Sequence, residues 1–253
     1  MTYLKRLSVA LLLSLSALVA LPSIAMEQQE TVLITGANRG IGLALAQQFH
    51  EAGYKVIGTA RKPDQATRLQ DLGVRVEQLD VASQDSVTAM AKRLQGMPVD
   101  ILINNAGISG HNTDAFADLD IDKLDTVLDI NTLGPLRVSQ ALLPNLLASQ
   151  RKIVANISSM MGSMELNTWG CCIGYRASKA ALNSANTTLS LEFAKQGMIF
   201  VVLHPGYVQT DMNDGKGQIT TQHSAEGLLK VISGLGAADN GKFYDYSGKP
   251  MPW

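Results

Sequence analysis

The stretch "TGANRGIG", residues 35–42, decides the fold of this chain. It follows a short apolar run, "TVLIT", and leads into "LALAQQFHEAG", whose apolar residues recur at helical spacing. A turn between a strand and a helix places free backbone amides, and the positive end of the helix dipole, where they can bind a phosphate group. Gly36, Gly40 and Gly42 allow the sharp turn and the close approach of a ligand. Glycines alone are equally typical of a flexible loop, so the rest of the chain must decide between the two.

Alternation of strands and helices continues along the whole chain after residue 30. Apolar runs predict strands at residues 31–35, 55–60, 74–80, 100–107, 152–159, 199–206 and 241–246. Helical patterns occupy residues 43–53, 85–94, 124–147 and 176–195. We therefore predict a single-domain α/β fold, a doubly wound, Rossmann-type three-layer sandwich with a mostly parallel seven-stranded sheet. Ligands of such sheets bind beyond the carboxyl ends of the strands, where the glycines and polar residues of this sequence collect.

Composition narrows the class of partner. The chain has 253 residues, of which 46% are hydrophobic and 17% charged, enough for one sizeable core. Its net charge is -1, and no cluster of Lys and Arg follows the first few residues. A nucleic-acid partner is therefore not expected, and a small molecule is.

The first 25 residues, "MTYLKRLSVALLLSLSALVALPSIA", differ from the body of the chain. Lys5 and Arg6 precede a long apolar run, and Ser23 and Ala25 are small residues at the positions that a signal peptidase recognises. We predict that residues 1–25 are a signal peptide or an N-terminal membrane anchor and that residues 26–253 form the domain. If the leader directs export, the protein is periplasmic or secreted. If the leader is not cleaved, it anchors the domain in the membrane, and no other membrane contact is expected. Translation from Met26 would instead leave the domain in the cytoplasm.

Cys171 and Cys172 are the only cysteines, and they are adjacent. Neighbouring cysteines seldom reach the geometry of a disulfide, so we expect none. Two thiols without histidine at ligand spacing also make a poor metal site. We therefore predict no metal and assign both side chains to apolar packing.

Several motifs in order carry a resemblance to a known family. The turn has three residues between its first two glycines. "NNAG" follows at residues 104–107, "ISS" at 157–159, "YRASK" at 175–179 and "HPGYVQTDM" at 204–212. Together they resemble the short-chain dehydrogenase/reductase family over the whole chain after the leader. More narrowly, "NISSMMGSM", "YRASKAALN" and "GKFYDYSGKPMPW" are similar to the branch with sniffer-type carbonyl reductases and C-factor-like proteins. The resemblance implies that the glycine turn binds the pyrophosphate of a nicotinamide dinucleotide.

Tyr175 and Lys179 are candidate catalytic residues. They are four residues apart on a predicted helix, so both side chains lie on one face. A cationic Lys179 would lower the pKa of Tyr175 toward neutral, and Tyr175 could then exchange a proton with a carbonyl oxygen. Ser159 can donate a hydrogen bond to the same oxygen. The resemblance implies these roles, a second contact of Lys179 with the nicotinamide ribose, and a relay water held by Asn131.

The serine assignment leaves alternatives. Ser159 precedes Tyr175 by 16 residues, whereas members of the family commonly place the serine about a dozen residues before the tyrosine. Ser158 and Ser163 therefore remain candidates, although the resemblance favours Ser159.

The end of the second predicted strand indicates which dinucleotide binds. An acidic residue there would bind the adenosine ribose hydroxyls and repel a 2'-phosphate, but this chain has Ala60 followed by Arg61. Arg61 and Arg39 can both pair with a phosphate dianion. We therefore predict NADP(H) in preference to NAD(H).

The resemblance implies a larger cofactor site, with Asp80 at the adenine amino group, Val81 beside its ring, and Val208 and Thr210 at the carboxamide. The predicted cofactor-binding residues are Gly36, Asn38, Arg39, Gly40, Ile41, Gly42, Arg61, Asp80, Val81, Asn105, Ala106, Gly107, Tyr175, Lys179, Pro205, Gly206, Val208 and Thr210.

The substrate is less visible than the cofactor. An apolar pocket is expected from segments that the resemblance places around the nicotinamide, with Met160, Met161, Met164, Trp169, Cys172, Tyr207 and Met212. The polar, glycine-rich residues 211–227 predict a mobile substrate loop.

Two functions from different classes follow. The first is an NADPH-dependent oxidoreductase that reduces an aldehyde or ketone to an alcohol, with a small-molecule carbonyl or alcohol as partner. The alternative is a dinucleotide-binding, C-factor-like signalling or interaction protein with incidental catalysis. Homo-oligomerisation is left open.

The leader gives a first testable prediction. We expect cleavage after Ala25 in the native host, because Ser23 and Ala25 fit the cleavage pattern. N-terminal sequencing of fractionated material measures this. A chain that starts at Met26 in the cytosolic fraction would favour the downstream start, and an intact leader in the membrane fraction would favour an anchor.

Overall fold

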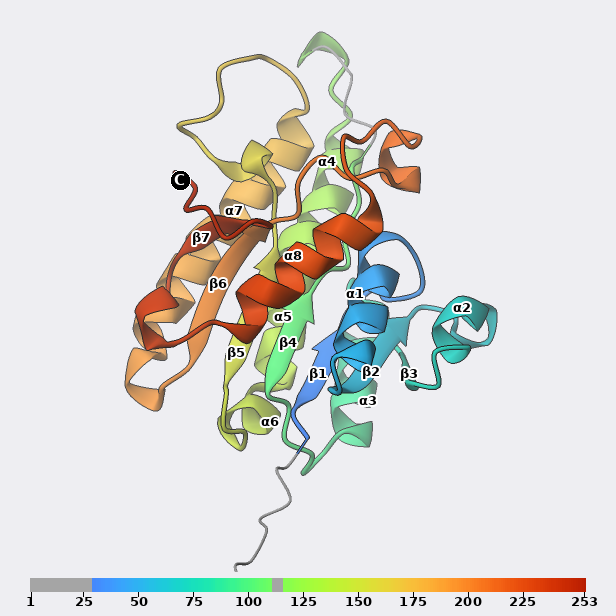
Figure 1. The fold of residues 1–253 in the computed structure, drawn as a ribbon. Coiled ribbons are helices and arrows are strands. Elements are labelled where there is room, and N and C mark those ends of the chain that lie inside the picture. The colour runs from blue at the N-terminus through green and yellow to red at the C-terminus, as the bar shows by residue number, and fades with distance from the viewer. Residues whose placement is uncertain (1–28, 111–115) are drawn as a thin grey trace, which may run out of the picture.

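Seven parallel strands form the centre of the computed structural model, which describes residues 29–110 and 116–253 (Figure 1). The strands are β1 Thr31–Ile34, β2 Lys55–Ala60, β3 Arg75–Gln78, β4 Ile101–Asn104, β5 Ile153–Ile157, β6 Ile199–His204 and β7 Phe243–Asp245. They are hydrogen-bonded in the order β3-β2-β1-β4-β5-β6-β7, and every pair is parallel. The predicted fold class and all seven predicted strands are confirmed. The predicted leader lies outside the described residues.

Helices cover both faces of the sheet (Figure 1). They are α1 Gly40–Glu51, α2 Thr67–Gln70, α3 Gln84–Arg93, α4 Ile121–Leu128, α5 Gly134–Ala141, α6 Leu143–Leu147, α7 Ile173–Glu192 and α8 Thr221–Ser233. Because both faces are covered, the central strands β1, β4 and β5 are buried at every residue, whereas the edge strands β3 and β7 are partly exposed. None of the helices in the described part of the chain is long and apolar enough to cross a membrane.

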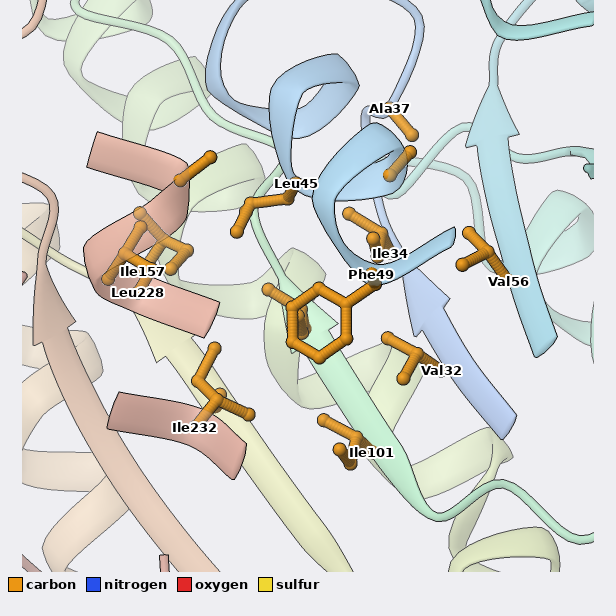
Figure 2. Close-up of a cluster of buried hydrophobic side chains, with 14 of the residues drawn as sticks. Val32, Ile34, Ala37, Leu45, Phe49, Val56, Ile101, Ile157, Leu228 and Ile232 are labelled. Atoms are coloured by element: carbon orange, nitrogen blue, oxygen red, sulfur yellow. The ribbon is translucent and has the colours of Figure 1, made fainter. Parts of the chain in front are cut away.

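The core beneath α1 and α8 shows how these two helices are held on the sheet. Phe49 of α1 is fully buried and lies near Val32 and Ile101 of the sheet, with Ile232 of α8 on its other side (Figure 2). Burial of side chains of this size stabilises the fold by about 1.5–3 kcal/mol each. The packing sets the start of α1, and therefore the glycine turn, at the carboxyl edge of the sheet.

The expected helical pattern at residues 124–147 is confirmed but is not one regular helix, because it contains a π-helical turn and a break at Leu142. The structure has α4, then a π-helical turn at Asp129–Leu133, and then α5 and α6. Pro135 lacks the amide hydrogen that a regular helix needs and lies just after the π-helical turn, whereas Pro144 lies in the first turn of α6, after the break. Asn131 lies on the π-helical turn, a feature often found at functional sites.

The expected mobile loop at residues 211–227 is also wrong in its second half, because α8 begins at Thr221. The side chain of Thr220 accepts a hydrogen bond from the amide of His223 and caps the helix. Ala225, Leu228 and Ile232 are fully buried at helical spacing. The polar, glycine-containing start of this helix concealed the pattern.

The strand order places a crevice at β1 and β4. The chain runs outward from β1 to β3 in one direction and then resumes at β4 on the other side of β1. The loop after β1 leads to one side of the sheet order and the loop after β4 leads to the other side. The two loops therefore diverge at the carboxyl edge, and the opening between them is the usual ligand site of doubly wound folds.

Candidate active site

The glycine turn after β1 has no room for side chains at two of its glycines. A Cβ at Gly36 would lie 3.0 Å from the Cα of Ala106, and a Cβ at Gly42 would overlap the carbonyl oxygen of Gly36. Gly36 and Gly40 also have φ angles of 65° and 56°, which favour glycine. The turn therefore depends on these residues for its shape and for its contact with the end of β4.

Thr35 and Asn105 hold the turn against β4. The Thr35 hydroxyl oxygen accepts hydrogen bonds from the amides of Asn105 and Ala106, at 2.9 and 3.0 Å. The Asn105 side-chain amide donates to the carbonyl oxygens of Thr35 and Gly36, at 2.9 and 3.1 Å. Sequence reasoning missed Thr35. Its position as the last residue before the turn was the available signal.

The first turn of α1 fits a phosphate group. The amides of Gly40, Ile41 and Gly42 donate no hydrogen bond to any described residue. The helix has no side-chain cap and no acidic residue in its first turn, so nothing in the described chain replaces an anion there. This agrees with a dinucleotide whose pyrophosphate lies at the turn.

Three predicted catalytic side chains meet at the start of α7. Lys179 is 5% exposed, and its Nζ donates to the carbonyl oxygen of Ile157 at 2.9 Å. The same Nζ lies 5.8 Å from the centre of the Tyr175 ring. Ser159 adjoins the Tyr175 hydroxyl closely enough to interact with it and to lower its pKa. Strand β5 and helix α7 thus bring together a hydroxyl, a phenol and an ammonium group.

Burial dominates the electrostatics of this cluster. It raises the pKa of Tyr175 above its ordinary value, and the interaction with Ser159 opposes that rise. It also lowers the pKa of Lys179 to about 8. The net direction of the Tyr175 pKa is therefore upward, opposite to the expected one, because desolvation of the phenolate exceeds the effect of Ser159.

The geometry separates the three candidate serines. Ser158 is 2% exposed, and its hydroxyl donates to Asn183 at 2.7 Å. Ser163 is 1% exposed and accepts from the amide of Leu166 at 3.1 Å. Of the three, Ser159 is the one that acts on the Tyr175 hydroxyl, which supports its choice as the catalytic serine.

Asn131 is completely buried and bonded to the protein. Its side-chain amide donates to the carbonyl oxygen of Ile108 at 2.8 Å and to the Ser178 hydroxyl at 3.1 Å, and its oxygen accepts from the Ile108 amide at 2.9 Å. Asn131 therefore ties the loop after β4 to α7. A Cβ at Gly107 would lie 3.0 Å from the Asn131 oxygen and 3.7 Å from the Lys179 Nζ, so all three residues adjoin.

The residues predicted around the adenosine lie at the ends of β2 and β3. Arg61 is exposed and follows Ala60, which is 3% exposed. The Asp80 carboxylate accepts from the amide of Ala82 at 3.1 Å, and Val81 is 8% exposed. This group is separate from the catalytic cluster, as an extended ligand requires.

The remaining predicted cofactor residues flank the glycine turn. Asn38 is exposed, and the exposed side chain of Arg39 forms an ion pair with Asp211 at 3.2 Å. A Cβ at Gly40 would lie 3.8 Å from the Cγ2 of Thr210, so the loop after β6 reaches the turn. That loop contains Pro205, Gly206 and Val208, and its Pro205 carbonyl oxygen accepts from Ser224 at 2.6 Å.

The expectation for the cysteines is wrong. Cys171 and Cys172 form a disulfide between adjacent residues, and no free cysteine occurs in the described chain. Cys172 adopts the left-handed conformation, with φ 61° and ψ 39°, which turns the chain so that both sulfurs can meet. The pair therefore immediately precedes α7, and its role is not simple apolar packing.

Exposed apolar side chains lie on the loops after β5 and β6. Met164, Trp169, Tyr207 and Met212 are between 45% and 72% exposed. The Trp169 ring also lies 4.5 Å from the guanidinium carbon of the buried Arg176, a cation–π contact. The apolar pocket expected from these residues stays a prediction. Met160 and Met161, which were also predicted to line the substrate pocket, are half-buried in the short helix after Ser159.

Comparison with known proteins places the chain in a family. A model of the short chain dehydrogenases matches residues 30–220, and the chain belongs to this family. C-signal of Myxococcus xanthus is 45% identical over 156 residues, which cover 62% of this chain and 93% of C-signal.

Two solved structures are similar over nearly all of the domain, and each match covers 89% of this chain. The NADPH-bound carbonyl reductase from chicken fatty liver is 35% identical, with a TM-score of 0.82 and 99% of its chain covered. The carbonyl reductase Sniffer of D. melanogaster is 31% identical, with a TM-score of 0.83 and 100% covered. The predicted resemblance is confirmed.

Burial of Lys179 predicts that this residue destabilises the protein at neutral pH. The unfolded-state pKa is 10.5 and the folded-state pKa about 8, so the full cost is present below pH 8 and disappears as the pH rises to 10.5. We expect Lys179→Met to raise the free energy of unfolding by about 1–3 kcal/mol at pH 7 and by much less at pH 10. Urea denaturation of residues 26–253 without cofactor measures this.

The exposed Lys195 provides the matched control. Lys195→Met should change the free energy of unfolding by less than about 0.5 kcal/mol. A Lys179→Met protein that is less stable than the wild type at pH 7 would contradict the expected cost of the buried ammonium group.

Proposed function

We propose that this chain is an NADPH-dependent reductase of aldehydes or ketones. The observation that carries the proposal is the meeting of Ser159, Tyr175 and Lys179 beside a glycine turn with free amides. The first group can hydrogen-bond a carbonyl oxygen and the second can protonate it. The turn can hold a dinucleotide at the same edge of the sheet.

Each residue of the cluster has a defined task in reduction. Bound NADPH supplies the hydride for the carbonyl carbon. Tyr175 keeps its proton at neutral pH because its pKa is raised, so it can donate that proton to the carbonyl oxygen. Ser159 stabilises the negative charge that develops on this oxygen. Lys179, with a pKa of about 8, is mostly protonated at pH 7, and its charge can stabilise the phenolate that remains after Tyr175 has given up its proton.

Asn131 supports the same site by a different route from the relay water that the family resemblance implies. All of its described hydrogen bonds join the loop after β4 to the π-helical turn and α7. We propose that it positions Gly107 and Lys179 relative to each other, since both adjoin its side chain.

The choice of NADPH rests on the charges at the adenosine end. Arg39 and Arg61 are both exposed, and Ala60 supplies no carboxylate to repel a 2'-phosphate. The solved relative from chicken fatty liver has NADPH bound. The two arginines and the missing acid therefore favour NADPH over NADH.

A second candidate function comes from the similarity to C-signal, which favours a signalling protein with incidental catalysis. Turnover by the purified domain distinguishes the two. No NADPH oxidation with a broad panel of small aldehydes and diketones would favour the signalling role.

We also propose that the domain is exported. The basic and apolar leader supports this location, and so does the disulfide, because disulfides persist in oxidising compartments.

Substitution of the phenol tests the mechanism. Tyr175→Phe should lower kcat by about 100- to 10,000-fold and leave NADPH binding nearly unchanged, because the hydroxyl acts on the substrate oxygen. Ser159→Ala should cause a loss of similar size by removing a hydrogen bond to that oxygen. NADPH oxidation and cofactor fluorescence measure the two effects. Undiminished turnover by Tyr175→Phe would refute the mechanism, and a loss in Ser158→Ala alone would move the serine role by one residue.

Charge exchange at the end of β2 tests the cofactor preference. The wild-type domain should bind NADPH more tightly than NADH, and Ala60→Asp with Arg61→Ala should reverse the order. The new carboxylate repels the 2'-phosphate, and we expect a loss of about 1–3 kcal/mol for NADPH. Isothermal titration of both proteins with both cofactors measures this, and equal affinities in the wild type would contradict it.

A further inference from the structure

Arg39 forms an exposed ion pair with Asp211. Its Nη1 lies 3.2 Å from the Oδ2 of Asp211, and the two side chains are 67% and 79% exposed. The ion pair joins the glycine turn after β1 to the loop after β6, although two strands, β4 and β5, separate β1 from β6 in the sheet. It therefore links two segments that border the crevice at the carboxyl edge.

Hydrogen bonds within the turn hold the backbone around Asp211 in place. Thr210 caps a short helix at Asp211–Asn213, with its amide donating to the Asn213 side chain at 3.1 Å. The Asn213 side-chain amide donates to the carbonyl oxygen of Val208 at 2.9 Å. The contact of Thr210 with Gly40 brings this turn against the glycine turn. Asp211 is thus presented to Arg39 by a hydrogen-bonded unit.

The pair is open to water and to exchange. Asp211 borders a cavity of about 490 Å³ that is also lined by Gln209, Thr210, Asp214 and Gly215. An exposed ion pair of this kind contributes little stability, so a doubly charged phosphate can displace the carboxylate. A neutral ribose hydroxyl at the same place cannot.

We propose that Asp211 competes with the 2'-phosphate of NADPH for Arg39. This competition limits the preference of the domain for NADPH over NADH. The inference rests on the proposed function, in which Arg39 binds this phosphate. Asp211 reduces the affinity for NADPH, because its carboxylate must be released before Arg39 can turn to the phosphate. It leaves the affinity for NADH almost unchanged, since no 2'-phosphate then claims Arg39.

Binding of two adenosine probes tests this without any turnover. The probes are adenosine 2',5'-bisphosphate and 5'-AMP, which differ by the 2'-phosphate alone, and isothermal titration at low salt gives both dissociation constants. Asp211→Asn should tighten binding of the bisphosphate by about 2- to 5-fold, in keeping with the small energies of exposed ion pairs, and should leave 5'-AMP unchanged.

Asp214→Asn is the matched control. Asp214 lies in the same turn, is 84% exposed and pairs with Lys216 at 3.6 Å, with no described contact to Arg39. The Asp214→Asn substitution therefore removes one negative charge from the same turn as Asp211→Asn does. If both variants tighten the bisphosphate equally, the effect is a general reduction of negative charge, and competition for Arg39 is refuted.

A double-mutant cycle tests the specific pair. In an Arg39→Gln background, Asp211→Asn should no longer tighten the bisphosphate, because the contested group is gone. A gain of the same size in both backgrounds would overturn the proposal. Weaker binding by Asp211→Asn would overturn it as well, since Asp211 would then position Arg39 for the phosphate.

The two proposals fail in different ways. A wild-type domain that prefers the bisphosphate but does not respond to Asp211→Asn refutes the competition and leaves the NADPH preference standing. A wild-type domain that binds both probes equally refutes the NADPH preference and the competition together.

Discussion

Close contact between the glycine turn and the end of β4 sets the positions of the other parts of the site. At Gly36 and Gly42 the backbone approaches its neighbours so closely that a methyl group would overlap them. Asn105 bridges the contact with two hydrogen bonds, and the chain then continues to Gly107, which adjoins Asn131 and Lys179. The free amides of α1 and the buried ammonium group of α7 are therefore positioned through one short segment. A shift in this contact would move the anion site and the catalytic cluster apart.

A chain of buried amides sets the position of α7 on the sheet. The Asn104 side chain donates to Asn156 at 2.9 Å, and Asn156 donates to Asn186 of α7, also at 2.9 Å. Buried polar networks of this kind specify one arrangement, because a slipped helix would leave several amides without partners. One acceptor, the Asn104 oxygen, has no partner in the described chain. The apolar core supplies most of the burial, whereas the amides determine where Tyr175 and Lys179 stand on the sheet.

The centre of the sheet was predictable from sequence because strands such as β1 and β4 are buried on both faces and therefore form short, largely apolar runs between turns. The glycine turn, Tyr175 and Lys179 were predictable because several motifs occur in the order that the family resemblance requires, with the turn between a strand and a helix and with Tyr175 and Lys179 four residues apart. Spacing could not distinguish Ser158 from Ser159. The distinction depends on Asn183, which accepts a hydrogen bond from Ser158 and so leaves Ser159 as the serine next to Tyr175. Spacing also missed the direction of the Tyr175 pKa, which depends on the depth of burial, and the disulfide, which depends on the conformation of Cys172. The start of α8 was missed because its cap and first turn are polar, and its buried face becomes evident only from Ala225 onward.

The disulfide at the start of α7 differs in its thermodynamics from most disulfides. A bond between distant residues stabilises a protein mainly by reducing the entropy of the unfolded chain. This effect grows with the logarithm of the number of residues in the loop that the bond closes. Cys171 and Cys172 are neighbours, so their bond closes no such loop. Its influence is confined to the backbone torsions of two residues, three positions before Tyr175. This cross-link therefore restricts the local geometry of the helix that carries Tyr175 while contributing almost nothing to the entropy difference between the folded and unfolded states.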